Sequence, residues 1–122
     1  MNIIIGLGNP GHKFAGHRHN IGFMTLDAYA EKGGLHFTQK DLFHAQLAQN
    51  GPDQLLAKPD TFINDSGKAA RMLAKQYDAS IVVVYDDIDI NIGLVKCSFD
   101  RGAGGHNGVQ SIIDHLGTKE FF

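Results

Sequence analysis

The chain has 122 residues, which is enough for one domain with its own hydrophobic core. Its apolar fraction of 43% and charged fraction of 20% are typical of a globular protein, and its one cysteine, Cys97, excludes an intrachain disulfide. The formal net charge of −2 argues against strong sequence-independent binding of nucleic acid, although contact with RNA at a few points is compatible with it.

The sequence shows neither a targeting signal nor a membrane-spanning run. Met1 leads directly into the apolar stretch Asn2–Leu7, with no basic region before it and no cleavage site after it. No apolar run approaches the length of a bilayer. Cys97 lies in the strand-like run VKCSF with no His beside it, so we interpret it as a packing residue rather than a nucleophile. These features predict a cytoplasmic protein.

The first half of the chain predicts a strand, a helix and a β-hairpin. Ile3–Leu7 is a continuous apolar run, typical of a strand covered on both faces. Asn20–Lys32 has apolar residues at helical spacing and is followed by two glycines. Apolar and polar residues alternate over Phe43–Leu47, and a second strand is expected over Gln54–Lys58. Asn50-Gly51 lies between them, and both of its residues tolerate positive φ.

The second half predicts two more helices and two more strands. Asp65 or Ser66 can cap a helix whose apolar face runs from Ala69 to Tyr77. Strands are expected over Ile81–Tyr85 and Leu94–Phe99.

The last helix completes a single α/β domain. Val109, Ile112, Ile113 and Leu116 form a helical stripe that ends at Gly117. The whole pattern predicts one domain over residues 1–122, with a mixed β-sheet flanked by helices.

The glycine-rich segment Gly6–Gly11 fits G-x-G-x-x-G and follows a predicted strand, as a dinucleotide-binding loop does. However, the next helix begins only near Asn20, and the acidic candidates Asp27 and Glu31 fall inside that helix instead of ending a second strand. A glycine turn that reverses the chain is the better interpretation.

Six polar residues lie where the chain changes direction, at predicted strand ends and helix starts, which is where α/β folds build their sites. A His oriented by an Asp is the basic unit of general-base chemistry, and nearby amides can hold a carbonyl or an oxyanion. The six residues are Asn9, His19, Asn64, Asp86, His106 and Asn107.

Two metal-based alternatives stay open from the residues alone. His17 and His19 could bind a metal together with His106, although no HExxH motif or cysteine pair accompanies them. The carboxylates between Asp86 and Asp89 could bind Mg²⁺ with phosphates or form a polar turn. Asp86 could instead orient His19.

Five segments together resemble bacterial peptidyl-tRNA hydrolases: GLGNPG, RHNIG, KPDTFINDSGKA, VVVYDDIDINIG and GAGGHNGVQSII. Their order and spacing fit along the whole chain. The resemblance implies hydrolysis of the ester between a peptide and the 3′ ribose of tRNA, without a metal or an organic cofactor. It also implies a monomer that contacts the peptide and the 3′ CCA end of peptidyl-tRNA, with no membrane and no obligate protein partner.

The resemblance also implies a role for each candidate residue. His19 is the general base that activates water, and Asp86 orients it. Asn107 helps to hold the water or the developing oxyanion, and His106 lies at the cleft wall near the tRNA end. The other substrate-binding residues line the cleft for the peptide and the reacting carbonyl: Asn9, Phe14, Phe62 and Asn64.

Three residues depart from the family pattern. Phe14 stands where Tyr is usual, Ile63 where Met is usual, and Tyr85 where His is common. Family members usually continue well beyond this length, into a part with basic residues that contact tRNA. We therefore expect a chain that is incomplete at its C-terminus and ends on two exposed aromatics, Phe121 and Phe122.

A second class of function stays open. Some relatives are RNA-binding proteins without enzymatic activity, such as splicing factors of chloroplasts, and they can keep the cleft residues. The net charge of −2 speaks against strong RNA binding by this chain.

Overall fold

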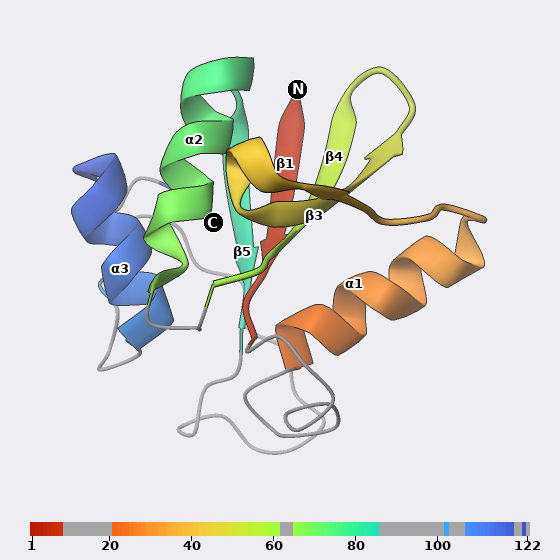
Figure 1. Ribbon diagram of the computed structural model, residues 1–122, viewed down its shortest axis with the longest axis horizontal. Helices are drawn as coiled ribbons and strands as arrows, with labels where there is room; N and C mark the ends of the chain where they lie inside the picture. The colour runs from red at the N-terminus through yellow and green to blue at the C-terminus, as the bar shows by residue number, and fades with distance from the viewer. Residues whose placement is uncertain (9–20, 62–64, 86–101, 103–106, 119–120, 122) are drawn as a thin grey trace.

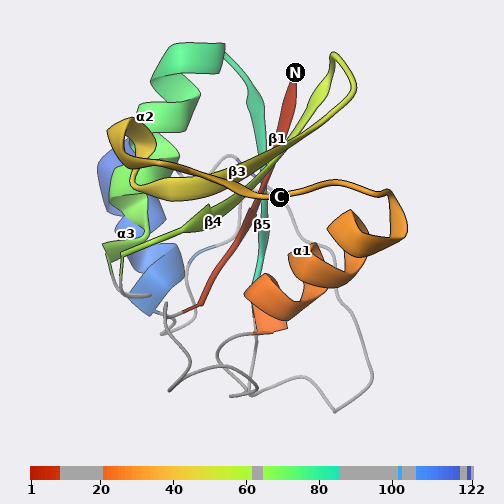
Figure 2. The same cartoon turned by 45° about the vertical axis from the view of Figure 1, so that its right-hand side comes forward.

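The computed structural model describes residues 1–8, 21–61, 65–85, 102, 107–118 and 121. In these ranges, a five-stranded sheet has helix α1 on one face and helices α2 and α3 on the other (Figures 1 and 2). The helices are α1 (Ile21–Lys32), α2 (Gly67–Tyr77) and α3 (Asn107–Leu116). The strands are β1 (Asn2–Gly6), β2 (Thr38–Lys40), β3 (Ala45–Asn50), β4 (Gln54–Pro59) and β5 (Ser80–Val84). None of the helices in the described ranges is long and apolar enough to cross a membrane.

The sheet is mixed, as the sequence predicts, with the strand order β2-β3-β4-β1-β5. Central β1 pairs in parallel with both neighbours, so that Ile3 lies between Leu55 of β4 and Ile81 of β5. β3 is antiparallel to β4 and to β2. The parallel strands therefore share one carboxyl edge.

Both faces of the central strands are buried, which explains the continuous apolar run in β1. Ile3 and Ile5 are fully buried in the main core, between the sheet and the helices α2 and α3. Ile4 points to the other face and packs on a smaller cluster with Leu26 of α1 and Leu56 of β4.

The predicted apolar faces of α2 and α3 pack against the sheet. Ala69, Ala70 and Leu73 of α2 are fully buried, and so is Ile112 of α3. Gly117 ends α3 in the left-handed region, at a φ of +74°, where a glycine has no steric penalty. The predicted helices and the predicted strands Ile3–Leu7, Gln54–Lys58 and Ile81–Tyr85 are thus confirmed, to within a residue or two at each end.

The connection around the hairpin differs from the prediction. Phe43 lies in a short 3₁₀ helix, η3 (Asp41–Phe43), and not in a strand, because His44 takes a left-handed conformation that separates η3 from β3. In the hairpin turn only Gly51, and not Asn50, has positive φ, since Asn50 still pairs with Gln54 as the last residue of β3.

Two further differences concern exposure. β2 was not predicted, because its three residues are all exposed and carry no apolar signal. Phe121 was expected to be exposed, but its side chain is only 7% exposed because it packs into the main core. The predicted strand Leu94–Phe99, Cys97 within it, and Phe122 lie outside the described residues.

Candidate active site

The carboxyl ends of the three parallel strands lie at one edge of the sheet. β1 ends at Gly6 and β5 at Val84, and these two residues are register partners. β4 ends at Pro59. Figure 1 shows that α1, α2 and α3 all begin on this side of the molecule. Open α/β sheets bind their ligands at this edge, and helix N-termini favour negative charge there.

Gly22 fixes the start of α1 against the ends of two strands. A Cβ atom on Gly22 would collide with the Leu7 nitrogen and the Val84 carbonyl oxygen, so only glycine allows this approach. The Leu7 N–H itself donates a hydrogen bond of 3.0 Å to the Val84 carbonyl. A Cβ on Gly8, next along from Leu7, would come within 2.8 Å of the ring of Phe23.

This junction joins the flanks of three candidate segments. Gly8 precedes Asn9, Gly22 follows His19 by three positions, and Val84 precedes Asp86 by two. The residues that border the predicted base, its predicted orienting carboxylate and one predicted substrate-binding amide therefore lie within one packed unit at the sheet edge.

A second junction holds the start of α2 on α3. The Gly67 N–H, which has no partner within its own helix, donates a 2.9 Å hydrogen bond to the hydroxyl of Ser111. A Cβ on Gly67 would clash with the Ser111 carbonyl and with the ring of His115. The predicted cap Ser66 occupies the N-cap position but makes no capping bond with its side chain. Asn64, three positions before Gly67, adjoins this junction in the sequence.

The predicted site residues themselves fall mostly outside the described ranges. Asn107 is the first residue of α3. The other seven lie outside the described residues: Asn9, Phe14, His19, Phe62, Asn64, Asp86 and His106. The structure thus describes the elements that border these residues in the sequence.

Metal binding was an open alternative. Within the part of the chain that the structure describes, no three His, Cys, Asp or Glu side chains gather around a common point. His17, His19, His106 and the carboxylates of residues 86–89 lie outside that part, so both metal alternatives stay untested.

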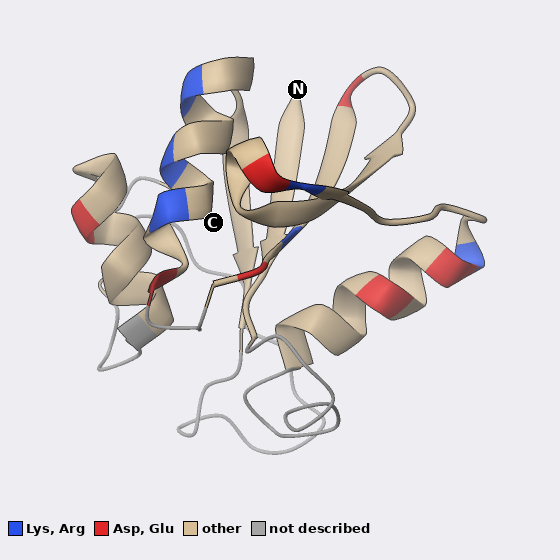
Figure 3. Ribbon diagram, in the orientation of Figure 1, with Lys and Arg blue, Asp and Glu red and all other residues tan. Residues whose placement is uncertain are grey.

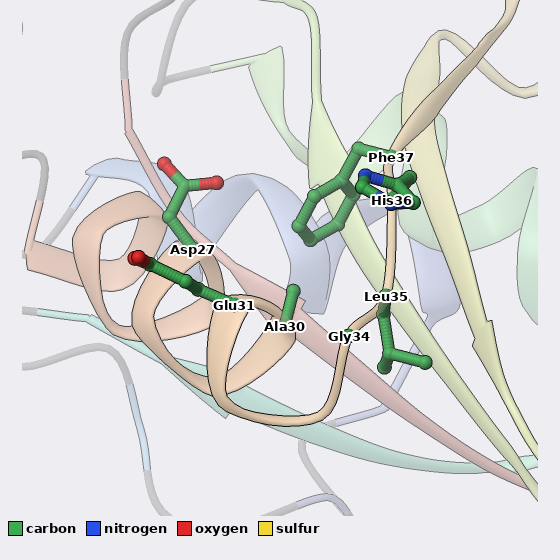
Figure 4. Close-up of a pocket in the computed structure, with 7 residues that line it drawn as sticks. All are labelled: Asp27, Ala30, Glu31, Gly34, Leu35, His36 and Phe37. Atoms are coloured by element: carbon green, nitrogen blue, oxygen red, sulfur yellow. The ribbon is translucent and has the colours of Figure 1, made fainter.

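A shallow cavity of about 330 Å³ lies at the far end of α1, away from the strand-end edge (Figure 4). Asp27, Glu31, His36 and Phe37 are among its lining residues. Asp27 is already paired with Lys58, at 2.6 Å. Because of this position, we interpret the cavity as a hollow of the protein surface and not as a reaction site.

The match to known proteins decides the family. The sequence model of the peptidyl-tRNA hydrolase family matches residues 3–122. This chain belongs to the peptidyl-tRNA hydrolase family. The similar solved structures include a peptidyl-tRNA hydrolase in complex with n-propanol and a peptidyl-tRNA hydrolase from Acinetobacter baumannii, each 31% identical with a TM-score of 0.93. An Arg-to-Gln variant of the Acinetobacter baumannii protein is 33% identical, with a TM-score of 0.92.

These comparisons cover 99% of this chain but only 64% of each relative. The chain therefore spans less than two thirds of the length of the peptidyl-tRNA hydrolases that it matches. Over the shared part, the TM-scores show that the sheet and helices described above are those of the family.

The structure adds two positions that sequence reasoning missed. Gly22 has a local signal, because a glycine inside a predicted helix is unfavourable and suggests a close packing contact. Ser111 has no such signal, since its partner Gly67 is 44 positions away in the sequence. Its role follows only from the packing of α2 on α3.

Proposed function

We propose that the chain hydrolyses the ester bond between a peptide and the 3′ ribose of tRNA, as the name of its family indicates. The proposed substrate is contacted through its peptide and its 3′ CCA end. Because this substrate arises from translation, we expect the protein to act in the cytoplasm, as a monomer and without an obligate protein partner.

In the proposed mechanism, His19 accepts a proton from a water molecule as that water attacks the ester carbonyl carbon. Asp86 orients the imidazole and stabilises its protonated form. The tetrahedral intermediate carries its negative charge on the former carbonyl oxygen, where Asn107 donates a hydrogen bond. The bond to the ribose oxygen then breaks, and this oxygen takes the proton from His19. The peptide carboxylic acid then loses its proton to solvent, so the products are a free peptide carboxylate and the 3′ hydroxyl of tRNA.

The remaining candidates bind the substrate. Asn9 and Asn64 hold the peptide backbone, which suits an enzyme that accepts peptides of many sequences, because amide side chains both donate and accept hydrogen bonds. Phe14 and Phe62 contribute apolar walls to the cleft. His106 lies toward the tRNA end.

The observation that carries this proposal is the junction at Gly22. It ties the start of α1 to the ends of β1 and β5, so the described residues that border the segments with Asn9, His19 and Asp86 are neighbours. A water-activating pair needs such proximity, because a base acts only within hydrogen-bond reach of the proton it removes.

Release of labelled peptide from peptidyl-tRNA tests the proposal and separates it from RNA binding without catalysis. A hydrolase converts the substrate to free peptide and intact tRNA with many turnovers per chain. A chain that binds the substrate and releases no peptide would favour the non-enzymatic RNA-binding alternative.

A further inference from the structure

Helix α2 presents a line of three cations to solvent. Lys68, Arg71 and Lys75 are all exposed, and α2 contains no acidic residue. Within the described ranges, none of the three has an ion-pair partner. Figure 3 shows the basic positions of α2 along its length.

The three positions share one face of the helix. At 3.6 residues per turn, positions i, i+3 and i+7 lie within about 60° of one another around the axis. The opposite face, with Ala69, Ala70 and Leu73, is buried in the core. The basic side chains therefore point away from the protein as one continuous stripe, here named the α2 stripe.

The other face of the sheet has a different charge pattern. On α1, Asp27 and Glu31 are exposed acidic residues, with Lys32 at the end of the helix. Lys58 on that side is only 14% exposed and is neutralised by Asp27. Helix α2 itself thus carries three cations and no acid, and the exposed acidic residues nearest to it lie just beyond its two ends, at Asp65 and Asp78, and on α3, at Asp114. The part of this surface that attracts a polyanion is therefore the outward face of α2 and not the whole side of the molecule.

The spacing of the stripe matches a nucleic-acid backbone. With a rise of about 1.5 Å per residue, Lys68 and Lys75 lie about 10 Å apart along the axis. One strand of a DNA duplex places a phosphate about every 3.4 Å along its axis, and on that scale the stripe spans about three phosphates. The stripe begins beside Gly67, at the end of α2 that faces the candidate active site.

We propose that the α2 stripe binds the phosphate backbone of the tRNA body, so that the RNA runs along α2 away from the strand-end edge. This inference rests on the proposed function for its choice of RNA. It adds a binding surface for the tRNA body to the recognition of the 3′ end described above. It also explains how a chain with a net negative charge can bind a large polyanion through one of its faces.

The direct test is binding of deacylated tRNA, measured by fluorescence anisotropy at 50 and 200 mM monovalent salt, for the chain and for its K68Q/R71Q/K75Q variant. Each lost phosphate contact lowers the slope of log affinity against log salt by about 0.9. Over this fourfold range the unsubstituted chain should therefore lose about 40-fold more affinity than the triple variant. R71Q alone should reduce the magnitude of the slope by about 0.9, which corresponds to the loss of one phosphate contact.

The matched control neutralises exposed lysines elsewhere, in K32Q/K40Q at the end of α1 and on β2. Its salt slope should stay that of the unsubstituted chain. An unchanged slope in the triple variant, or an equal change in the control, would overturn the proposal. Circular dichroism of all variants establishes that they are folded.

Binding of deacylated tRNA requires no hydrolysis, so the two proposals fail separately. If the chain releases peptide while the triple variant keeps its full salt slope, the proposed hydrolysis is supported and the proposed tRNA contact at the α2 stripe is contradicted. If the salt slope depends on the stripe but no peptide is released, the tRNA contact is supported and the proposed hydrolysis is contradicted.

Discussion

The backbone amide of Gly67 donates a hydrogen bond of 2.9 Å to the side-chain hydroxyl of Ser111, which lies 44 positions later in the chain. One helix is thereby capped by a side chain of its neighbour. The contact is buried, and it ties the start of α2, next to Asn64, to α3, which begins at Asn107.

Ser111→Ala should lower the free energy of unfolding by about 1–3 kcal/mol, because the Gly67 amide would be left buried without an acceptor. Urea unfolding of both proteins measures the difference. Ser80→Ala, at an exposed strand position, is the matched control and should change stability by less than about 0.5 kcal/mol. Equal stability of Ser111→Ala and the unsubstituted chain would show that the cap contributes nothing.

Gly22→Ala should destabilise the fold by about 1–3 kcal/mol, because the added methyl group meets the backbone of Leu7 and Val84, which cannot move aside as a flexible side chain can. Peptide release should fall by about 10²-fold in the folded fraction, since the junction joins the residues that border both halves of the proposed His–Asp pair.

Gly33→Ala is the control for this substitution, because a Cβ at Gly33 has its nearest neighbour at 3.6 Å. Thermal unfolding and single-turnover peptide release are compared for the two variants. A Gly22→Ala protein with the stability and the activity of Gly33→Ala would mean that the junction is not a tight constraint.

Much of the fold could be predicted from local sequence, because helical and strand periodicities are local signals. The stripe from Val109 to Leu116 and the apolar run of β1 both pack as their patterns indicate. β2 was missed because it has no apolar face in its sequence. It forms a strand only through its backbone pairing with β3. Phe43 was misassigned because its alternation with Ala45 continues across the left-handed turn at His44.

The candidate site was predictable only in part. Residue types at strand ends pointed to a His–Asp pair, but Mg²⁺ binding and a polar turn stayed open as interpretations of the carboxylates at residues 86–89, and weak ligand chemistry argued against a metal site at the histidines. The assignment of roles came from five motifs in register. The contacts that hold the frame, Gly67 on Ser111 and Gly22 on Val84, join distant parts of the sequence and emerge only from the packed structure.

Hydrolysis should survive treatment with EDTA followed by its removal, because the proposed mechanism activates water with His19 and routes no step through a metal. Mg²⁺ should be restored before the assay, since it affects the folding of the tRNA itself. Peptide release that is abolished by chelation and recovered with stoichiometric Zn²⁺, but not with Mg²⁺, would instead favour a histidine metal site.

The central claim is that His19 is the general base, and single-turnover cleavage of peptidyl-tRNA by His19→Ala tests it most directly. The account predicts a rate constant lower by about 10²- to 10⁴-fold, a smaller loss for Asp86→Asn, and no change for the control His36→Ala, at an exposed position remote from the strand-end edge. Near-normal cleavage by a folded His19→Ala protein would contradict the account.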